Sequence, residues 1–313
     1  PMMYVSLPVH ENFDVVANQL QNFARYLPEA MVVIHVSKQA TFDQNQLQKF
    51  LQLYALDNYI VNPEQAATRW GNIFAAHLAN VRMIAKQQDA TKVLFHSSND
   101  MLVKEGLAAY LADKNNLFHY RPLLKDSHWV PANRARGDIK LTDWLTKINA
   151  GRLIGSQIEG SVYEMPLLKS LLATIDNAVV EAAPNYPQEE IIFSSFAVAN
   201  GVVADGLPYV LSEVHRFDAL LWGYFSGVVP VAKNKRIKKL LQKRLVKQAN
   251  YAITLADIMA IREQDTAHLA SFQYLNDGNS IWQVHTINNL YGVKRIKRDM
   301  RDPLRLYLSG ETL

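Results

Sequence analysis

Strands and helices alternate through the first hundred residues, and this order constrains the fold more than any other feature of the sequence. Short apolar segments rich in β-branched residues alternate with longer segments whose apolar residues recur at helical spacing. The expected strands are residues 2–9, 30–37, 58–63 and 92–95, and the expected helices are 12–27, 41–55 and 71–88. This alternation predicts an α/β fold with a mostly parallel sheet, helices on both faces and right-handed crossovers.

Small polar residues follow the last of these strands. The apolar segment KVLF (92–95) leads directly into HSSND (96–100). In open α/β sheets, ligands bind beyond the carboxyl ends of the strands. We therefore expect a ligand site where the strands finish, at His10, Ser37 and Asp100.

Composition limits the class of protein. The chain has 313 residues, of which 49% are hydrophobic, and it contains no cysteine. This size favours a single catalytic domain over 1–313. The lack of cysteine excludes disulfides and a cysteine nucleophile and is typical of a reducing compartment. The longest apolar segment, 217–232, is shorter than the roughly 20 residues of a membrane-spanning helix, so we expect a cytoplasmic protein.

Positive charge is concentrated in one segment. The net charge is +4, but KNKRIKKLLQKRLVK (233–247) holds many Lys and Arg residues and no acid, so the rest of the chain is net acidic. Such local charge argues against a nucleic-acid partner. Apolar residues recur at helical spacing within this segment, which predicts a basic amphipathic helix. It is either a peripheral element on the inner, anionic face of a membrane or a helix packed on its own domain with a solvated basic face.

Several common site motifs do not occur in the sequence. It has no G-x-x-x-x-G-K-[ST], G-x-G-x-x-G, H-E-x-x-H or G-x-S-x-G. Readings as a P-loop, dinucleotide-binding, zinc-protease or α/β-hydrolase protein therefore lose support.

Seven short segments occur in the same order as motifs of a known family. In chain order they are VHEN (9–12), IHVSK (34–38), RWGNIFAAHLANV (69–81), SSNDMLV (97–103), IGSQIEGSVYEMPLL (154–168), YPQEEIIF (186–193) and WGYFSG (222–227). Together they resemble the core-2/I-branching β-1,6-N-acetylglucosaminyltransferases, glycosyltransferase family 14, as a bacterial relative. The resemblance departs from the family where Ser37 replaces an Asp and where Q-E-E replaces P-D-E, and it is poor beyond residue 230.

The resemblance implies a GT-A type nucleotide-sugar transferase. Such an enzyme would invert the anomeric centre while moving a sugar from a nucleotide-diphosphate donor, with UDP the expected nucleotide. The acceptor would be a hydroxyl of a surface glycan or lipid-linked saccharide, as in polysaccharide or lipopolysaccharide biosynthesis. The family's general base falls on Glu190, with Glu189 beside it, and a base of this kind must be a carboxylate. Alternatively, the two acids only favour the start of a helix.

The same resemblance assigns the donor contacts. It places His10, Ser37, Trp70 and Asp100 near the donor. Asp100 could instead cap an expected helix over 102–111, a common position for Asp.

The diphosphate is expected to be held without a metal. Family 14 enzymes lack the second Asp of an Asp-x-Asp metal site and use basic side chains, which can neutralise phosphate without a metal ion. The resemblance puts these cations near the C-terminus without a clean match. The candidates are Arg244 and Lys247, followed by Arg262, His268, Arg295 and Lys297.

Acceptor contacts are assigned to aromatic and charged residues. Trp222 and Tyr224 match acceptor-facing aromatics of the family, whose rings pack on the apolar faces of sugars, although a core strand would also contain such residues. Arg134 and Arg136 lie in a segment (128–144) expected to be a loop. They would contact an acidic acceptor or lie solvated. Glu159 is a further acceptor candidate.

Two other functions fit the sequence. One is a non-catalytic carbohydrate-binding relative that kept the fold and does not need Glu190. The other is a different nucleotide-using enzyme on a doubly wound sheet, such as a nucleotidyltransferase or hydrolase, which would need a metal cluster.

Overall fold

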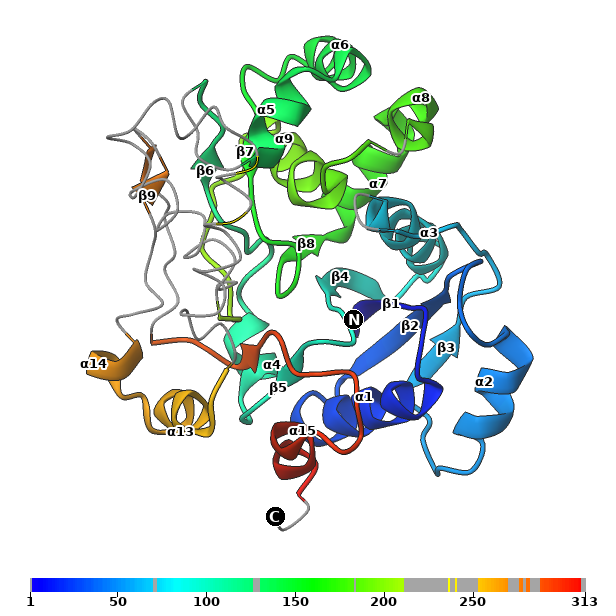
Figure 1. The fold of residues 1–313 in the computed structure, drawn as a ribbon. Coiled ribbons are helices and arrows are strands. Elements are labelled where there is room, and N and C mark those ends of the chain that lie inside the picture. Colours follow the sequence, from blue (N-terminus) through cyan, green and yellow to red (C-terminus); the bar gives the residue numbers. More distant parts are fainter. Residues whose placement is uncertain are drawn as a thin grey trace.

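The fold is seen in a computed structural model of the chain (Figure 1). It describes residues 2–69, 72–125, 130–182, 184–210, 253–269 and 288–310, the single residues 236 and 240, and the backbone of 276–277 and 280–281.

A five-stranded sheet forms the centre of the molecule. Its order is β3-β2-β1-β4-β8. The first four strands, β1 (Met2–Val9), β2 (Ala30–Val36), β3 (Tyr59–Val61) and β4 (Ala90–Phe95), are parallel. The edge strand β8 (Val162–Glu164) runs antiparallel to β4. The predicted α/β fold with a mostly parallel sheet is therefore confirmed.

The strand order reverses beside β1. The chain passes from β1 to β2 and β3 on one side and returns to place β4 on the other side. The carboxyl ends of β1 and β4 thus flank a topological switch point, where open α/β sheets bind ligands.

Helices cover both faces of the sheet because alternate strand residues point to opposite sides. On one face, Val5 and Leu94 pack with Leu20 of α1 (Phe13–Tyr26). On the other face, Tyr4 and Phe95 belong to a second core with Leu78 of α3 (Ile73–Ala85). Figure 1 shows α1 and α3 on opposite sides of β1 and β2.

The other elements extend these layers. They are α2 (Gln44–Leu51), β5 (Met101–Leu102), α4 (Leu107–Leu111), β6 (Arg121–Pro122), α5 (Val130–Arg136), α6 (Ile139–Lys147), β7 (Ile154–Gly155), α7 (Met165–Thr174), α8 (Asn177–Glu181), the 3₁₀ turn η1 (Gln188–Glu190), α9 (Ile192–Ala199), α13 (Leu255–Glu263), α14 (Thr266–Leu269), β9 (Asn276–Asp277), β10 (Ser280–Ile281), β11 (Gly292–Val293) and α15 (Pro303–Leu308).

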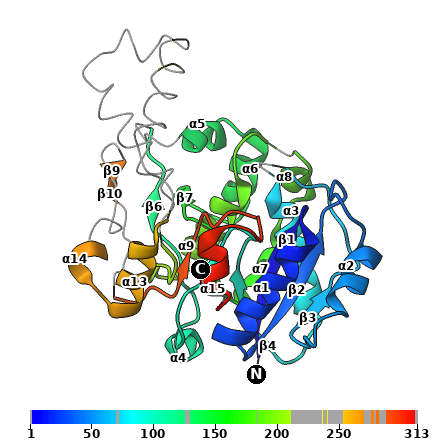
Figure 2. The ribbon, with the colours of Figure 1, turned by 60° about the horizontal axis from the view of Figure 1, so that its bottom comes forward.

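The C-terminal helix α15 packs beside α1 (Figure 2). Its Arg305 is fully buried and donates to Asn18 Oδ1 at 2.9 Å and to the Ser98 carbonyl at 2.8 Å. These bonds join the end of the chain to α1 and to the polar loop after β4.

Some predicted helix bounds were wrong. The helix expected over 41–55 begins at Gln44, because Asp43 and Gln46 form a capping box that satisfies two backbone donors. Glu189 and Glu190, which could have marked the start of a helix, lie instead in the turn η1 before α9.

The segment 128–144 was expected to be a loop, but its described residues, 130–144, include all of α5 and most of α6. Proline is tolerated in the first turn of α5, where its missing N–H would have no helical partner. Asp138 caps α6, and the side chains of Leu141 and Trp144 are buried on one face of that helix. Burial of this apolar face outweighs the Pro and Gly signals that favoured a loop.

The basic segment 233–247 lies outside the described residues except for Arg236 and Leu240, which are helical and exposed. None of the helices in the described part of the chain combines the length and apolarity needed to cross a membrane.

The ring of Tyr209 holds three distant segments together. An added Cβ at Gly160 would lie 2.5 Å from this ring, and one at Gly292 would lie 2.6 Å from it. His96 Nε2 lies 2.9 Å from the acceptor Gln19 Oε1, so Nε2 carries the proton of the neutral ring. The Tyr209 hydroxyl therefore donates to the other ring nitrogen, Nδ1, at 2.7 Å. Tyr209 therefore contacts the loop after β7, strand β11 and the end of β4 at once.

A pair of glycine variants tests this packing. Gly160 and Gly201 both have left-handed φ values, +86° and +77°, but nothing lies within 4 Å of a Cβ at Gly201. Gly201→Ala should cost about 1–2 kcal/mol from backbone strain alone. Gly160→Ala should cost about 1–3 kcal/mol more, because its methyl overlaps the Tyr209 ring. Urea unfolding measures both, and equal losses would contradict the close packing.

Candidate active site

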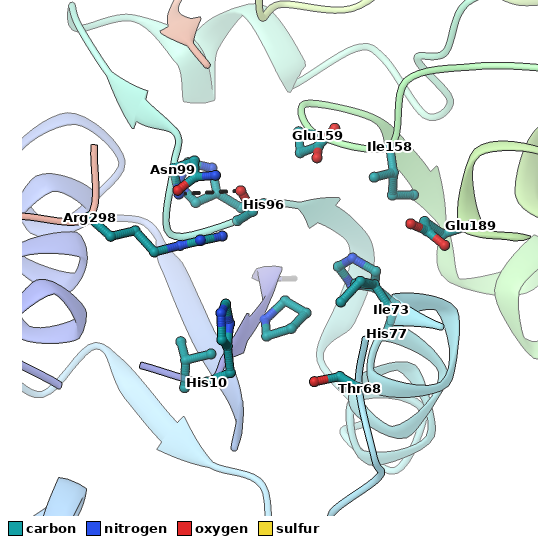
Figure 3. Close-up of a pocket in the computed structure, with 13 residues that line it drawn as sticks. His10, Thr68, Ile73, His77, His96, Asn99, Ile158, Glu159, Glu189 and Arg298 are labelled. Atoms are coloured by element: carbon teal, nitrogen blue, oxygen red, sulfur yellow. Dashed lines mark hydrogen bonds between the residues drawn. The ribbon is translucent and has the colours of Figure 1, made fainter. Parts of the chain in front are cut away.

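A cavity of about 140 Å³ lies at the switch point, beside the carboxyl ends of β1 and β4 (Figure 3). Its walls come from β1 and the residue after it, the loop after β4, α3, the loop before β8, the turn η1 and the segment after β11. The lining residues used below are His10, His77, Glu159, Glu189 and Arg298. Of the three strand-end residues at which a ligand site was predicted, His10 lines this cavity, whereas Ser37 and Asp100 do not.

An ion pair stands at one wall. Lys294 Nζ donates to Glu159 Oε2 at 2.8 Å, and the two side chains are only 12% and 19% exposed. Burial opposes the charge of Glu159, but the adjacent ammonium outweighs it and holds the pKa of the carboxyl below its usual value. Burial likewise opposes the charge of Lys294, yet the carboxyl groups of Glu159, Asp100 and Glu190 raise its pKa.

Three further carboxyl groups surround this pair. Burial, reinforced by the negative charge of Glu159, raises the pKa of Asp100, Glu189 and Glu190 to about 8 in each case. Buried carboxyl groups beside another carboxylate resist ionisation. At neutral pH these three groups therefore hold protons while the Glu159–Lys294 pair stays charged.

Some buried oxygens of this cluster have no hydrogen-bond partner. Among the described residues, Glu189 Oε2 and Asp100 Oδ1 are buried without one. Buried polar atoms are normally bonded, and exceptions often belong to functional sites. Glu189, the residue of this pair that lines the cavity, thus carries a buried carboxyl oxygen without a partner.

The two candidate bases differ in position. Both lie in η1, where Glu189 is 7% exposed and lines the cavity. Glu190 is half-buried and is not one of the residues that line it; its carbonyl accepts a hydrogen bond from Ser156 N at 2.8 Å.

The predicted donor residues are only partly brought together. His10 lines the cavity. Ser37 is buried, and its hydroxyl accepts from Thr68 Oγ1 at 2.6 Å, at the edge of a neighbouring shallow depression. Trp70 lies outside the described residues.

Asp100 is fully buried beside the cavity. Its Oδ2 accepts from Ser97 N at 2.8 Å and closes the turn that follows β4. It does not cap the next helix, because α4 begins only at Leu107, after Gly106. The alternative of a helix cap was therefore wrong.

The predicted diphosphate cations are placed elsewhere or not described. Arg244 and Lys247 lie outside the described residues. Arg262 donates to the Val103 carbonyl at 2.7 Å, and His268 bonds to Asp257 at 2.7 Å, so both make contacts within the protein.

The predicted acceptor residues are also divided. Glu159 lines the cavity. Arg134 donates to the Asn185 carbonyl at 2.6 Å and Arg136 to the Leu123 carbonyl at 3.0 Å, so both guanidinium groups bind the neighbouring main chain. Trp222 and Tyr224 lie outside the described residues.

Three residues at the site were missed from the sequence. They are His77, Lys294 and Arg298, whose Nε donates to Ser98 Oγ at 2.7 Å. The basic cluster KRIKR (294–298) offered a signal, since Arg295 and Lys297 within it were considered. No spacing rule connects Lys294 to Glu159, 135 residues earlier, or Arg298 to Ser98, 200 residues earlier.

In the parts of the chain that the structure describes, no group of three or more His, Asp or Glu side chains is arranged to hold a metal ion. Metal independence itself stays a prediction.

Comparisons with known proteins give weak likenesses. No protein-family model matches the sequence, and no curated protein matches it. Similar solved structures include S. aureus TarS, with 15% identity over 71% of this chain and 40% of TarS and a TM-score of 0.35. They also include galactosyltransferase LgtC in complex with donor and acceptor sugar analogs, with 11% identity over 69% of this chain and 77% of LgtC and a TM-score of 0.40. The chain spans less than half the length of TarS, and TM-scores this low leave the activity to be argued from the site.

The raised pKa of Glu189 predicts how stability depends on pH. Between its unfolded value of 4.5 and its folded value of about 8, the folded protein binds a proton that the unfolded chain does not. The contribution of Glu189 to the free energy of unfolding should therefore be present at about pH 4.5 and be lost as the pH rises to about 8. Glu189→Gln should flatten this fall, measured by urea unfolding across the range. Glu181→Gln, at an exposed position, is the control; identical slopes for wild type and Glu189→Gln would contradict the raised pKa.

Proposed function

We propose that this protein is a GT-A type glycosyltransferase. It moves a sugar, with inversion, from a nucleotide-diphosphate donor, UDP-linked, to a hydroxyl of a surface-glycan or lipid-linked saccharide acceptor. The observation that carries the proposal is the cavity at the switch point, where carboxyl groups and a cation face one space. The ordered resemblance to family 14 supports the same conclusion.

The reaction requires one displacement at the anomeric carbon. The acceptor oxygen forms a bond to this carbon as the bond to the diphosphate oxygen breaks, and the diphosphate leaves with the electron pair. A carboxylate takes the proton of the attacking hydroxyl. The resemblance favours Glu190 for this role, while the lining of the cavity favours Glu189. A pKa of about 8 makes either group a strong base once it is ionised, so turnover should rise with pH up to that value.

The leaving diphosphate needs positive charge. Arg298 lines the cavity, and Lys294 stands behind Glu159. Basic side chains can stabilise a departing phosphate without a metal ion. We assign the neutralising role to these two residues, in place of the less well matched Arg244 and Lys247, and propose a metal-independent reaction.

A lipid-linked acceptor would require the protein to act at a membrane surface. A basic amphipathic helix over 233–247 would attract an anionic membrane surface by about 1 kcal/mol per cation. Such a contact at the inner face of the membrane would give a cytoplasmic enzyme access to a lipid-linked acceptor.

Paired variants test the base. Glu189→Gln and Glu190→Gln each keep the shape of the side chain and lose one ionisable group. The variant that removes the base should slow release of UDP from UDP-sugars, in transfer or slow hydrolysis, by roughly 10²–10⁴-fold, while the other should change it little. Equal slowing would indicate a shared electrostatic effect. UDP-sugar binding by the wild type without any turnover would instead support a non-catalytic carbohydrate-binding protein.

A second pair tests the cation. Arg298→Gln should weaken UDP binding by roughly 10-fold or more, the range for a lost charged hydrogen bond. Lys297→Gln, at an exposed position outside the cavity lining, should leave binding unchanged. Calorimetric titration with UDP in EDTA measures both. Loss of wild-type UDP binding in EDTA would contradict metal independence.

A further inference from the structure

His77 is a buried histidine whose ring forms part of the cavity wall. It lies on α3, is 2% exposed and packs edge-on against Phe95, with ring centroids 5.0 Å apart. Its Nδ1 lies 2.8 Å from Ser6 Oγ. Since Nδ1 is turned to Ser6, Nε2 is the polar atom that the ring can present to the cavity.

A directed chain of hydrogen bonds leads to this ring. Asn62 Oδ1 accepts from the backbone N–H of Glu64 at 3.0 Å, so its Nδ2 must donate, and it does so to Asn80 Oδ1 at 3.0 Å. Asn80 Nδ2 then donates to the Val33 carbonyl at 3.1 Å and to Ser6 Oγ at 3.0 Å. The N–H of Glu64 can only donate and the carbonyl of Val33 can only accept, so neither the Asn62 nor the Asn80 amide can be flipped.

The direction of this chain determines the tautomer of His77. Ser6 is fully buried and already accepts from Asn80. Among the described residues, its hydroxyl proton has His77 Nδ1 as its hydrogen-bonding acceptor. An unsatisfied buried donor is costly, so Ser6 donates to Nδ1. Burial lowers the pKa of His77 to about 3, so the ring is neutral and its one proton is on Nε2.

The wall beside His77 offers a complementary group. Glu189 lines the same cavity, and its buried Oε2 has no partner among the described residues. Figure 3 shows His77 and Glu189 on one side of the cavity and Arg298 on the other. The negative charge of Glu159, which also lines the cavity and acts on the His77 ring, disfavours a phosphate there. A sugar hydroxyl can accept from an N–H and also bond to a carboxyl group.

We propose that His77 is a substrate-binding residue, whose Nε2–H donates to a hydroxyl oxygen of the saccharide, next to Glu189. This inference rests on the proposed function and adds that the sugar occupies the His77 side and the diphosphate the Arg298 side. Asn80 and Ser6 are positioning residues that keep the proton on Nε2. In this tautomer His77 cannot accept a proton through Nε2, so it is not a general base.

The tautomer can be read directly in the ligand-free protein. Long-range ¹H–¹⁵N correlation spectra of the imidazole rings should show His77 protonated on Nε2 and not on Nδ1. Ser6→Ala removes the donor to Nδ1 and should allow Nδ1 protonation to appear. A wild-type ring protonated on Nδ1 would overturn the inference whatever the protein binds. A Ser6→Ala spectrum unchanged from wild type would overturn the positioning role.

Binding then tests the contact with the sugar. UDP, UDP-glucose, UDP-galactose and UDP-N-acetylglucosamine are titrated into wild type, His77→Phe and His77→Gln. His77→Phe keeps a ring against Phe95 but loses the donor. It should weaken binding of the UDP-sugar that the wild type prefers by roughly 3- to 10-fold, the range for one neutral hydrogen bond, and leave UDP unchanged.

The outcomes separate the two proposals. His77→Gln can place an amide N–H near the position of Nε2 and should recover much of the affinity. If wild type binds a UDP-sugar and His77→Phe binds it equally well, or loses UDP to the same extent, only the role of His77 is overturned. If wild type binds neither UDP nor any UDP-sugar, the proposed transferase function fails and the inference fails with it.

Discussion

The site depends on the packing of one aromatic ring. Tyr209 fits against Gly160 and Gly292 only because neither residue has a Cβ. Glu159 directly precedes Gly160, and Lys294 follows Gly292 by two residues. The ring therefore fixes the two backbones at a separation that allows the 2.8 Å ion pair between these side chains. Packing of an apolar surface, in this way, positions the charges of the cavity.

Burial of the carboxyl groups is costly but gives them useful properties. Groups with a pKa near 8 are neutral enough at neutral pH to share a small space, yet each is a stronger base than an exposed carboxylate when it ionises. Perturbed ionisable groups gather at functional sites because catalysis needs such values. Protonated, partly unbonded acids contribute little to stability, which is consistent with the catalytic role proposed for this cluster.

The cavity has two chemically different sides. Arg298 supplies positive charge on one side, while the other side holds the neutral ring of His77 and the carboxyl of Glu189. A ligand with an anionic end and a hydroxyl-bearing end fits this division. The buried amides of Asn62 and Asn80 behind α3 contribute as well, because their fixed direction sets which atom of His77 carries the proton.

Local patterns in the sequence determined the parallel sheet and predicted a ligand site at its carboxyl edge. The four parallel strands were predicted because β-branched apolar segments carry their own signal, and the polar residues after β4 marked the ligand edge. The ordered motifs also singled out His10, Glu159 and Glu189, which line the cavity, and Glu190, which does not. Helix starts such as Gln44 were missed, because the capping box between Asp43 and Gln46 sets the first residue of the helix, and the spacing of apolar residues does not show it. Only the tertiary structure decided that Lys294, Arg298 and His77 lie at the cavity. Their partners Glu159, Ser98 and Ser6 are 135, 200 and 71 positions away along the chain, and no sequence period records contacts at such separations. For Lys294 and Glu159, the contact depends on how Tyr209 packs against Gly160 and Gly292.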